Sequence, residues 1–334
     1  MSARTGHRVA LWAGLAALAV LGGALAVQPA AANPTHANGQ IVFGRYNPAL
    51  DDTVLYTVNP DGTHVQRVLP FAFECPHWSP DGTRIATCGA GQSENGGFTI
   101  INPDTGSYRQ VPGPKPGLIT ACYLWSPDAT RLACESWSDS KPWRNGIYTI
   151  RISDGQDLRR VTFNRHRGND TPIAYSPNGK RIAFIRSDGD ENTLGIFVVR
   201  TDGTGLRQIA PEGVTCCGGG WSPQGNDIVF SRHVNPDVHS SIWIVHADGT
   251  GLREVPAQPA YGCGGPNEDP EAGGCFDPGW SPDGTRIVFG TGSDDLGRNI
   301  YTVRPDGTGL TQVTHGGRAQ SNEAPNWGTH PLAH

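Results

Sequence analysis

The sequence predicts an all-β fold, a six-bladed β-propeller with four antiparallel strands in each blade. Three observations support this prediction: two phrases recur along the chain, turn residues separate short β-branched and aromatic runs, and the two ends of the chain complement each other within one repeat. The 334 residues are enough for one large domain, and their 45 Gly and 27 Pro leave little room for long helices.

The first recurring phrase combines an aromatic residue, a tight turn and a second strand. Asp tolerates the geometry of such a turn and Gly accepts a positive φ, so each copy predicts an antiparallel hairpin. A sixth copy is cut short at Trp327. The five fuller copies are WSPDGTRIA at 78–86, WSPDATRLA at 125–133, YSPNGKRIA at 175–183, WSPQGNDIV at 221–229 and WSPDGTRIV at 280–288.

The second phrase predicts the outer hairpin of each blade. Its six copies are LYTVNPDGTHVQRV at 55–68, FTIINPDTGSYRQV at 98–111, IYTIRISDGQDLRRV at 147–161, IFVVRTDGTGLRQI at 196–209, IWIVHADGTGLREV at 242–255 and IYTVRPDGTGLTQV at 300–313. The two phrases together recur about every 50 residues, which is the length of a four-stranded blade.

Both ends of the chain are expected in one blade. The segment 41–43 (IVF) matches the second strand of the repeat, and the missing first strand is supplied around Trp327. Such a joint ties down the termini and leaves no open sheet edge. The propeller is therefore expected at 41–328, after a short linker at 33–40 and before a tail at 329–334.

The first 32 residues have the pattern of a secretory signal. Arg4 and Arg8 precede an apolar run at 9–27, and a small-residue cleavage site ends at Ala32. We expect cleavage there, which leaves no membrane span and places a monomer in the periplasm or cell envelope. The run is also just long enough to cross a bilayer, so an uncleaved anchor is the alternative. The net charge of −5, with no basic stripe, argues against nucleic acid as a partner.

The repeated phrases resemble the WD40-like (PD40-type) repeat of the TolB-like propeller family, over about residues 41–328. TolB proteins are similar periplasmic propellers, preceded by an α/β domain and working with the Pal lipoprotein. Here the propeller is expected within ten residues of the cleavage site, so that preceding domain is not expected. The resemblance implies the fold, and propellers host many activities.

The variable connections of the predicted blades gather on one face, which we call the loop face. Strand direction alternates, so the short Pro-Asp-Gly turns gather on the opposite face, the turn face. Specificity is expected on the loop face, where the longest connection runs from 256 to 279.

Eight cysteines in an exported chain favour disulfides, and all eight fall on the loop face. Hairpin register places Cys75 opposite Cys88, and Cys122 one residue out of register with Cys134, which a β-bulge would absorb. The adjacent Cys216 and Cys217 form a vicinal disulfide or pair elsewhere. The expected pairs are Cys75–Cys88, Cys122–Cys134, Cys216–Cys217 and Cys263–Cys275.

Carboxylates, histidines and tryptophans of the loop face are the candidates for a site. Two acidic residues stand four positions before an inner-strand aromatic, and two others lie near that level, so they are expected to ring the channel mouth. The candidate ligand-binding residues are Glu74, His77, Asp170, Asp277, Glu323, Trp137 and Trp143. The repeated aromatics, such as Trp78 and Trp327, are expected to pack between sheets.

The sequence favours a non-catalytic binding or scaffold module. We find no recurring nucleophile and base, and no Gly-x-Ser-x-Gly motif. The expected partner is a protein, a peptide or a cell-envelope glycan that docks on the loop face. The alternative is a divalent-cation-dependent lyase or hydrolase acting on carbohydrate or lactone, with calcium or another divalent ion held by the mouth carboxylates. No cofactor is otherwise expected.

Overall fold

The computed structural model describes residues 37–72, 74–89, 93–190, 192–211, 214–232, 240–256, 274–292, 297–317 and 320–334. The expected secretory signal at 1–32 lies outside the described residues. Within the described ranges, no helix has the length and apolar character needed to cross a bilayer.

The described residues form 24 strands, mostly antiparallel, and one short 3₁₀ helix, η1 (Pro142–Arg144). One four-stranded sheet has the order β24 (Asn322–Trp327), β1 (Ile41–Asn47), β2 (Asp52–Val58) and β3 (Gln66–Ala72). Three others are formed by β12 (Arg167–Tyr175), β13 (Arg181–Asp188), β14 (Thr193–Arg200) and β15 (Arg207–Ala210); by β16 (Val214–Trp221), β17 (Asp227–Arg232), β18 (Ser241–His246) and β19 (Arg253–Glu254); and by β20 (Gly274–Trp280), β21 (Ile287–Gly292), β22 (Asn299–Val303) and β23 (Thr311–Gln312).

The remaining strands form one eight-stranded sheet where the sequence predicts two separate blades. It contains β4 (Glu74–Trp78), β5 (Ile85–Cys88), β6 (Gly96–Ile101), β7 (Tyr108–Pro112), β8 (Ile119–Trp125), β9 (Arg131–Trp137), β10 (Gly146–Arg151) and β11 (Arg159–Arg160). Its antiparallel halves are joined by parallel pairing of Gly96 and Gly97 with Thr120 and Ala121. Glycine permits this approach, since a Cβ on Gly96 would lie 2.3 Å from the Thr120 carbonyl oxygen. The hydrogen-bonded sheets of the described chain therefore number five.

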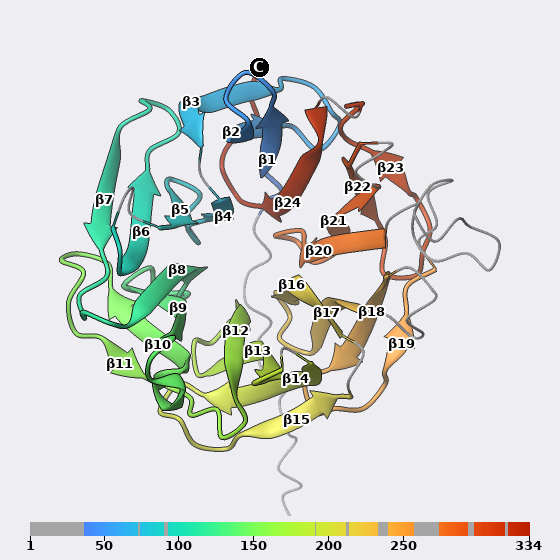
Figure 1. The fold of residues 1–334 in the computed structure, drawn as a ribbon. Coiled ribbons are helices and arrows are strands. Elements are labelled where there is room, and N and C mark those ends of the chain that lie inside the picture. The colour runs from blue at the N-terminus through green and yellow to red at the C-terminus, as the bar shows by residue number, and fades with distance from the viewer. Residues whose placement is uncertain are drawn as a thin grey trace, which may run out of the picture. The chain divides into compact units, whose positions relative to one another are not determined.

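The inner strands of residues 33–334 are arranged around a common centre. Figure 1 shows β4, β8, β12, β16, β20 and β24 nearest that centre, with β3, β7, β11, β15, β19 and β23 at the rim. The expected joining of the chain ends is present, because β24 pairs with β1, with Ile41 opposite Trp327 and Arg45 opposite Asn322.

The repeated Ser-Pro-Asp-Gly-Thr sequence forms a hydrogen-bonded turn. In the first copy, Ser79 Oγ donates to Asp81 Oδ1 at 2.5 Å and accepts from the Arg84 backbone N–H at 2.9 Å. Thr83 also donates to Asp81. The same two serine bonds recur in the copies that begin at Ser126, Ser176 and Ser281. In the copy that begins at Ser222, Ser222 Oγ accepts from the Asp227 backbone N–H. The repeated aromatics Trp78, Trp125, Tyr175, Trp221 and Trp327 are buried, as expected for packing between sheets. Trp280 is only partly buried and packs against a core cluster that contains Phe289 and Val303.

The segment after Trp327, expected as a tail, returns along the turn face and is bound there. The His330 ring stacks on Trp78 with centroids 4.8 Å apart, and its Nδ1 lies 2.8 Å from the Gly82 carbonyl oxygen. Gln40 donates its backbone N–H to the His330 carbonyl, and Ala333 donates to Asn59 Oδ1. This segment therefore links the two ends of the chain beyond the β24–β1 pairing.

Replacing His330 with alanine is expected to lower the free energy of unfolding by about 1–2 kcal/mol, because stacking on Trp78 and the hydrogen bond to the Gly82 carbonyl are lost together. Urea unfolding of His330→Ala measures the change. Leu332→Ala is the matched control, since Leu332 is exposed in the same segment. Equal stability of the two variants would show that the segment is only loosely attached.

Candidate functional site

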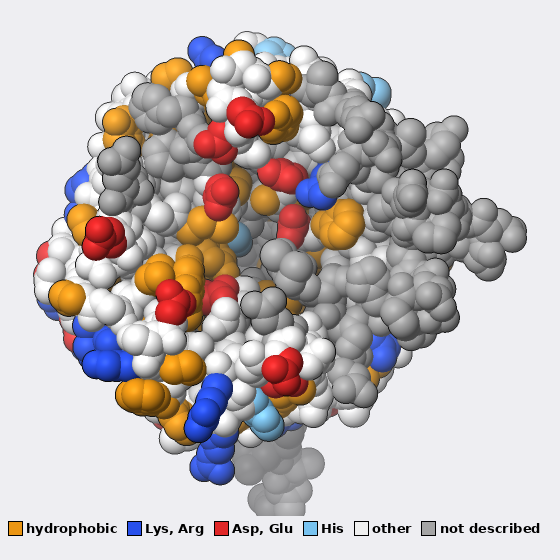
Figure 2. All heavy atoms as spheres, viewed as in Figure 1, with side chains coloured by type: hydrophobic (Ala, Val, Ile, Leu, Met, Phe, Trp, Pro, Cys, Tyr) orange, Lys and Arg blue, Asp and Glu red, His pale blue; other side chains and the backbone are white. Residues whose placement is uncertain are grey.

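A cavity of about 480 Å³ lies at the centre of the loop face, between the ends of the inner strands. Figure 2 shows acidic side chains gathered around this hollow, with hydrophobic ones inside it. A second cavity of about 540 Å³ is lined by the aromatics and prolines of the Ser-Pro turns. The two cavities share His77, Ile173 and Asn326, so they are successive parts of one central channel. We call the first part the mouth cavity.

Bulges in the inner strands shape the mouth cavity. The register shifts in each inner strand just before its aromatic residue. Cys75, Asp277 and Ala324, each three positions before that aromatic, take left-handed φ values of 54°, 50° and 49°. The sequence predicts a bulge only in the hairpin that carries Cys122 and Cys134, and there the register shifts between Cys122 and Leu124. A bulge also displaces Cys75, so Glu74 rather than Cys75 pairs with Cys88.

Five of the seven candidate residues line the mouth cavity: Glu74, His77, Trp137, Asp277 and Glu323. They come from β4, β9, β20 and β24, which are far apart in the sequence. The expectation that inner-strand carboxylates meet at the mouth therefore agrees with the geometry for three of the four acidic residues.

Asp170 does not reach the cavity. Its side chain is fully buried, and its two carboxylate oxygens accept from Arg186 Nε and Nη2 at 2.7 and 2.8 Å. Thr162 Oγ1 also donates to it at 2.5 Å. The reason is register, because Asp170 pairs with Arg186 of β13 and lies five positions before Tyr175, one position beyond the level of Glu74 and Glu323.

Trp143 also lies outside the mouth cavity. It belongs to η1, and 58% of its surface is exposed. The loop before β10 carries it away from the centre, whereas Trp137, at the end of β9, is still part of the inner wall.

Glu135 is a cavity residue that the sequence reasoning missed. It lies on β9, and its Oε2 accepts from Thr171 Oγ1 of β12 at 3.0 Å. Burial raises the pKa of this carboxyl, and the hydrogen bond from Thr171 opposes the rise. No other copy of the repeat has an acidic residue at this position, so the repeat pattern holds no signal for it.

The carboxylates of Asp277 and Glu323 repel each other in the cavity. Burial, and then the neighbouring Glu323 charge, raise the pKa of Asp277 to about 6. The Glu323 carboxylate has two stabilising partners, because Thr53 Oγ1 donates to its Oε1 at 2.9 Å and Arg298 Nη1 lies 3.1 Å from its Oε2. At neutral pH the mouth cavity therefore holds more negative than positive charge.

His77 adds no positive charge to the cavity at neutral pH. Burial lowers its pKa to about 4, although Nδ1 lies 3.3 Å from the Cys75 carbonyl oxygen. Its ring centroid is 5.2 Å from that of Tyr123, which also lines the cavity. The histidine and the tyrosine together give the cavity an aromatic wall.

Two disulfides join the pairs that hairpin register predicts, Cys75–Cys88 and Cys122–Cys134. The first lines the mouth cavity, and the second is fully buried in the core. Cys275 is also disulfide-bonded. The expected partner Cys263 and the side chains of Cys216 and Cys217 lie outside the described residues.

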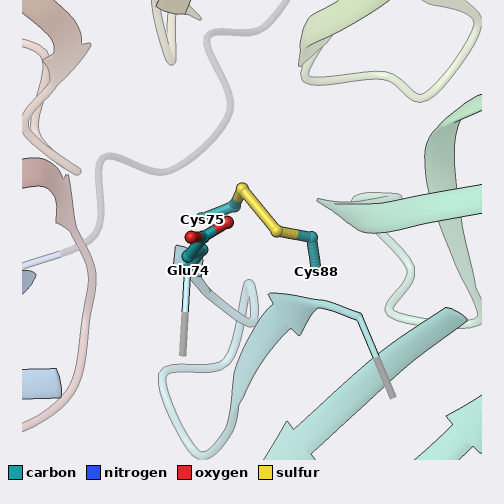
Figure 3. Close-up of side chains that lie close together, drawn as sticks. All are labelled: Glu74, Cys75 and Cys88. Carbon is teal, nitrogen blue, oxygen red and sulfur yellow. A yellow bond between two sulfur atoms is a disulfide. The ribbon is translucent and has the colours of Figure 1, made fainter. Parts of the chain in front are cut away.

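The donor set beside the first disulfide does not fit a divalent cation. Among the described residues, one group of three potential metal ligands has its ligand atoms within 4.8 Å of one another. This group consists of Glu74, Cys75 and Cys88. Figure 3 shows the Glu74 carboxylate beside the two bonded sulfur atoms. A disulfide offers no thiolate, and calcium prefers six to eight oxygen ligands.

Replacing Asp277 with asparagine is expected to stabilise the protein at pH 7 by about 1–3 kcal/mol. The pKa of about 6 lies above the value of the unfolded chain, so ionisation of Asp277 costs stability as the pH rises through 6. Asparagine keeps the size of the side chain and tolerates the left-handed φ. The gain should vanish at pH 3.5, where the carboxyl is protonated in both states.

Thermal and urea unfolding of Asp277→Asn at pH 7 and pH 3.5 measure this difference, and Asp139→Asn, at an exposed loop position, is the control. A gain of the same size at both pH values would contradict the assigned charge repulsion.

The chain is similar in sequence to a known protein family and to proteins of other organisms. The family model described as the TolB beta propeller domain (PD40) matches residues 37–256. The Tol-Pal system protein TolB of Anaeromyxobacter sp. (strain K) is 29% identical over 130 residues, which cover 39% of this chain and 27% of that protein. A WD repeat-containing protein WDS homolog of Arabidopsis thaliana is 29% identical over 124 residues, 36% of this chain and 21% of that protein. The matches thus span about a quarter of these relatives.

Solved structures share the fold at low sequence identity. TolB from Acinetobacter baumannii is similar with a TM-score of 0.65 and 20% identity, covering 86% of this chain and 66% of that one. A putative TolB from Agrobacterium tumefaciens has a TM-score of 0.60 and 19% identity, covering 87% and 99%. An oligogalacturonate lyase in complex with manganese has a TM-score of 0.53 and 14% identity, covering 83% and 74%.

Proposed function

This chain belongs to the TolB beta-propeller domain family, and from this premise we propose that it is a non-catalytic, extracytoplasmic binding module. Its mouth cavity takes up a cationic group of a partner protein or peptide. The two disulfides support a location outside the cytoplasm, where thiols are oxidised. The proposal includes the secretory signal at 1–32 and a monomeric mature protein.

The proposed architecture has six blades over residues 41–328. The eight-stranded sheet supports this count, because it divides at the β6–β8 contact into two four-stranded antiparallel halves. The pairing of β24 with β1 supports a ring closed by both ends of the chain.

The observation that carries the functional proposal is the charge of the mouth cavity. Glu74, Glu135, Asp277 and Glu323 line it, whereas the cation Arg298 forms an ion pair with Glu323 and opposes the rise in the pKa of Asp277. An ammonium or guanidinium group that entered would relieve the repulsion between Asp277 and Glu323. Aromatic walls strengthen the binding of a cation, whereas an anionic glycan would be repelled.

The test is a binding comparison of the mature protein with the double variant Glu135→Gln/Glu323→Gln. Each protein is immobilised and exposed to an envelope extract of the source cells, and the retained proteins are identified by mass spectrometry. We expect a partner that the wild type and the control Glu94→Gln retain and the double variant releases, with affinity lowered at least ten-fold. Glu94 is exposed on the loop before β6. Retention of the same proteins by all three forms would contradict the proposal.

The cation-dependent lyase or hydrolase is an outcome of the same experiment. Turnover of a polyuronate or lactone that requires added calcium or manganese, and that Glu74→Gln abolishes, would replace the binding proposal with the enzymatic one.

A further inference from the structure

A third hollow, of about 450 Å³, lies apart from the central channel. Its walls come from the segment after β11, from β13 and β14, and from the turn before β15. Val161, Val199 and Leu206 form an aliphatic floor, and Phe163, Arg165 and His166 form one rim. We call it the side pocket. None of the mouth-cavity residues lines it.

One exposed aromatic side chain, Phe163, lines the side pocket, and a second, Trp143, belongs to a segment that Arg160 joins to it. Phe163 is 50% exposed and Trp143 is 58% exposed, although both are large apolar groups. Arg160 fixes the segments that carry them: its guanidinium lies 4.9 Å from the Phe163 ring centroid, and its Nη2 donates to the Trp143 carbonyl at 2.9 Å. The Phe163 ring and the backbone at Trp143 are therefore held in place before any partner arrives, which lowers the entropy lost on binding.

The rim of the side pocket is basic in a protein of net negative charge. The segment 159–167 (RRVTFNRHR) contains four arginines and a histidine and no acidic residue. Arg165, His166 and Arg167 are exposed, and the side chains of Arg165 and Arg167 make no hydrogen bond or ion pair among the described residues. Two cations thus face solvent next to an apolar hollow.

We propose that the side pocket docks an acidic segment of a partner protein, with one apolar side chain seated on the aliphatic floor and carboxylates on Arg165 and Arg167. Arginine is among the residues that dominate protein–protein binding energies, and Arg165 lines the side pocket next to the exposed Phe163. This surface is separate from the mouth cavity, so the inference goes beyond the function proposed above.

A peptide fits this surface better than a bilayer or a glycan. The apolar part is concave, and a flat membrane surface cannot fill it. Asp188 is the strand partner of Arg167 in the β12–β13 register. Its negative charge repels a continuous layer of anionic headgroups, whereas a single acidic segment can bind the arginines without approaching it. The aliphatic floor offers no hydrogen bonds to sugar hydroxyls.

The test is selection of binders from an unbiased displayed library of random twelve-residue peptides against the immobilised mature protein. We expect the selected peptides to combine Asp or Glu with a Leu or Phe. Calorimetry should show affinity lowered about ten-fold or more by Arg165→Glu and by Phe163→Ala. Arg67→Glu, an exposed arginine of β3, is the matched control and should bind as the wild type does.

Three outcomes would overturn the inference. The library yields no peptide that depends on residues 163 and 165; the selected peptides lack acidic residues; or the protein binds phosphatidylglycerol vesicles, through these same residues, in place of peptides. The variants Glu135→Gln/Glu323→Gln should leave peptide binding unchanged, so failure here and failure of the mouth-cavity proposal are distinguishable. Unfolding midpoints of all variants confirm that exposed positions were changed without loss of fold.

Discussion

Ending the chain after Gln320 is expected to abolish cooperative folding, whereas ending it after Gly328 leaves a folded protein. The longer deletion removes β24, which pairs with β1 and brings the buried Trp327 into a cluster with Ile41, Phe43 and Val288. Loss of a buried tryptophan alone costs about 3–5 kcal/mol. The deletion also unpairs the whole β1 edge, so the sum reaches the 5–15 kcal/mol that typically holds a domain together.

Circular dichroism and urea unfolding of the two truncated chains measure this effect. The chain that ends at Gly328 is the control, since it keeps β24 and loses only the segment around His330. A sigmoidal unfolding transition in the shorter chain would show that the strand at the C-terminus is dispensable and that the two ends need not share a sheet.

Replacing Asp170 with alanine is expected to lower the free energy of unfolding by about 3–5 kcal/mol. Asp170 is fully buried and Arg186 nearly so, and the arginine lies over the Phe184 and Phe197 rings, 5.2 and 5.3 Å from their centroids. Without the carboxylate, a guanidinium is left in an apolar place without its counter-charge. Thr162 and Asn164 lose an acceptor at the same time.

The double variant Asp170→Leu/Arg186→Met is the informative companion. It removes both charges and keeps similar volume, so it should be more stable than either single variant, because a buried ion pair is often replaceable as a unit. Urea unfolding of the wild type, Asp170→Leu, Arg186→Met and the double variant forms a double-mutant cycle. Additive losses would mean that the two side chains act independently and that Asp170 has another role.

The fold was predictable because each blade carries its own local signal. The Ser-Pro-Asp-Gly-Thr turns satisfy their own hydrogen bonds, and the aromatic before the serine is buried in four of the five copies, Trp280 being partly buried. The union of two blades into one sheet was not predictable, since it rests on the close approach of Gly96 to Thr120, about which the repeat pattern says nothing.

The site was predictable in part. Both Glu74 and Glu323 stand four positions before an inner-strand aromatic, and this spacing predicts their place at the mouth cavity. It does so because β4 and β24 have a bulge at the same position before the aromatic. Asp170 lies one residue beyond this level and binds Arg186 inside the protein, as alternation of side chains along a strand permits. Asp277 lies one residue short of it, but the bulge with a left-handed φ at Asp277 still places it in the cavity. Glu135 was missed because it lies on β9, the neighbouring strand, where the rule does not apply.

The most direct test of the mouth cavity as the binding site is photo-crosslinking from two positions on opposite faces. A benzophenone amino acid replaces Trp137, on the cavity wall, or Leu310, on an exposed turn between β22 and β23. The account predicts that the retained partner is cross-linked from position 137 and not from position 310. Cross-linking from position 310 with none from position 137 would place binding on the turn face and contradict the account.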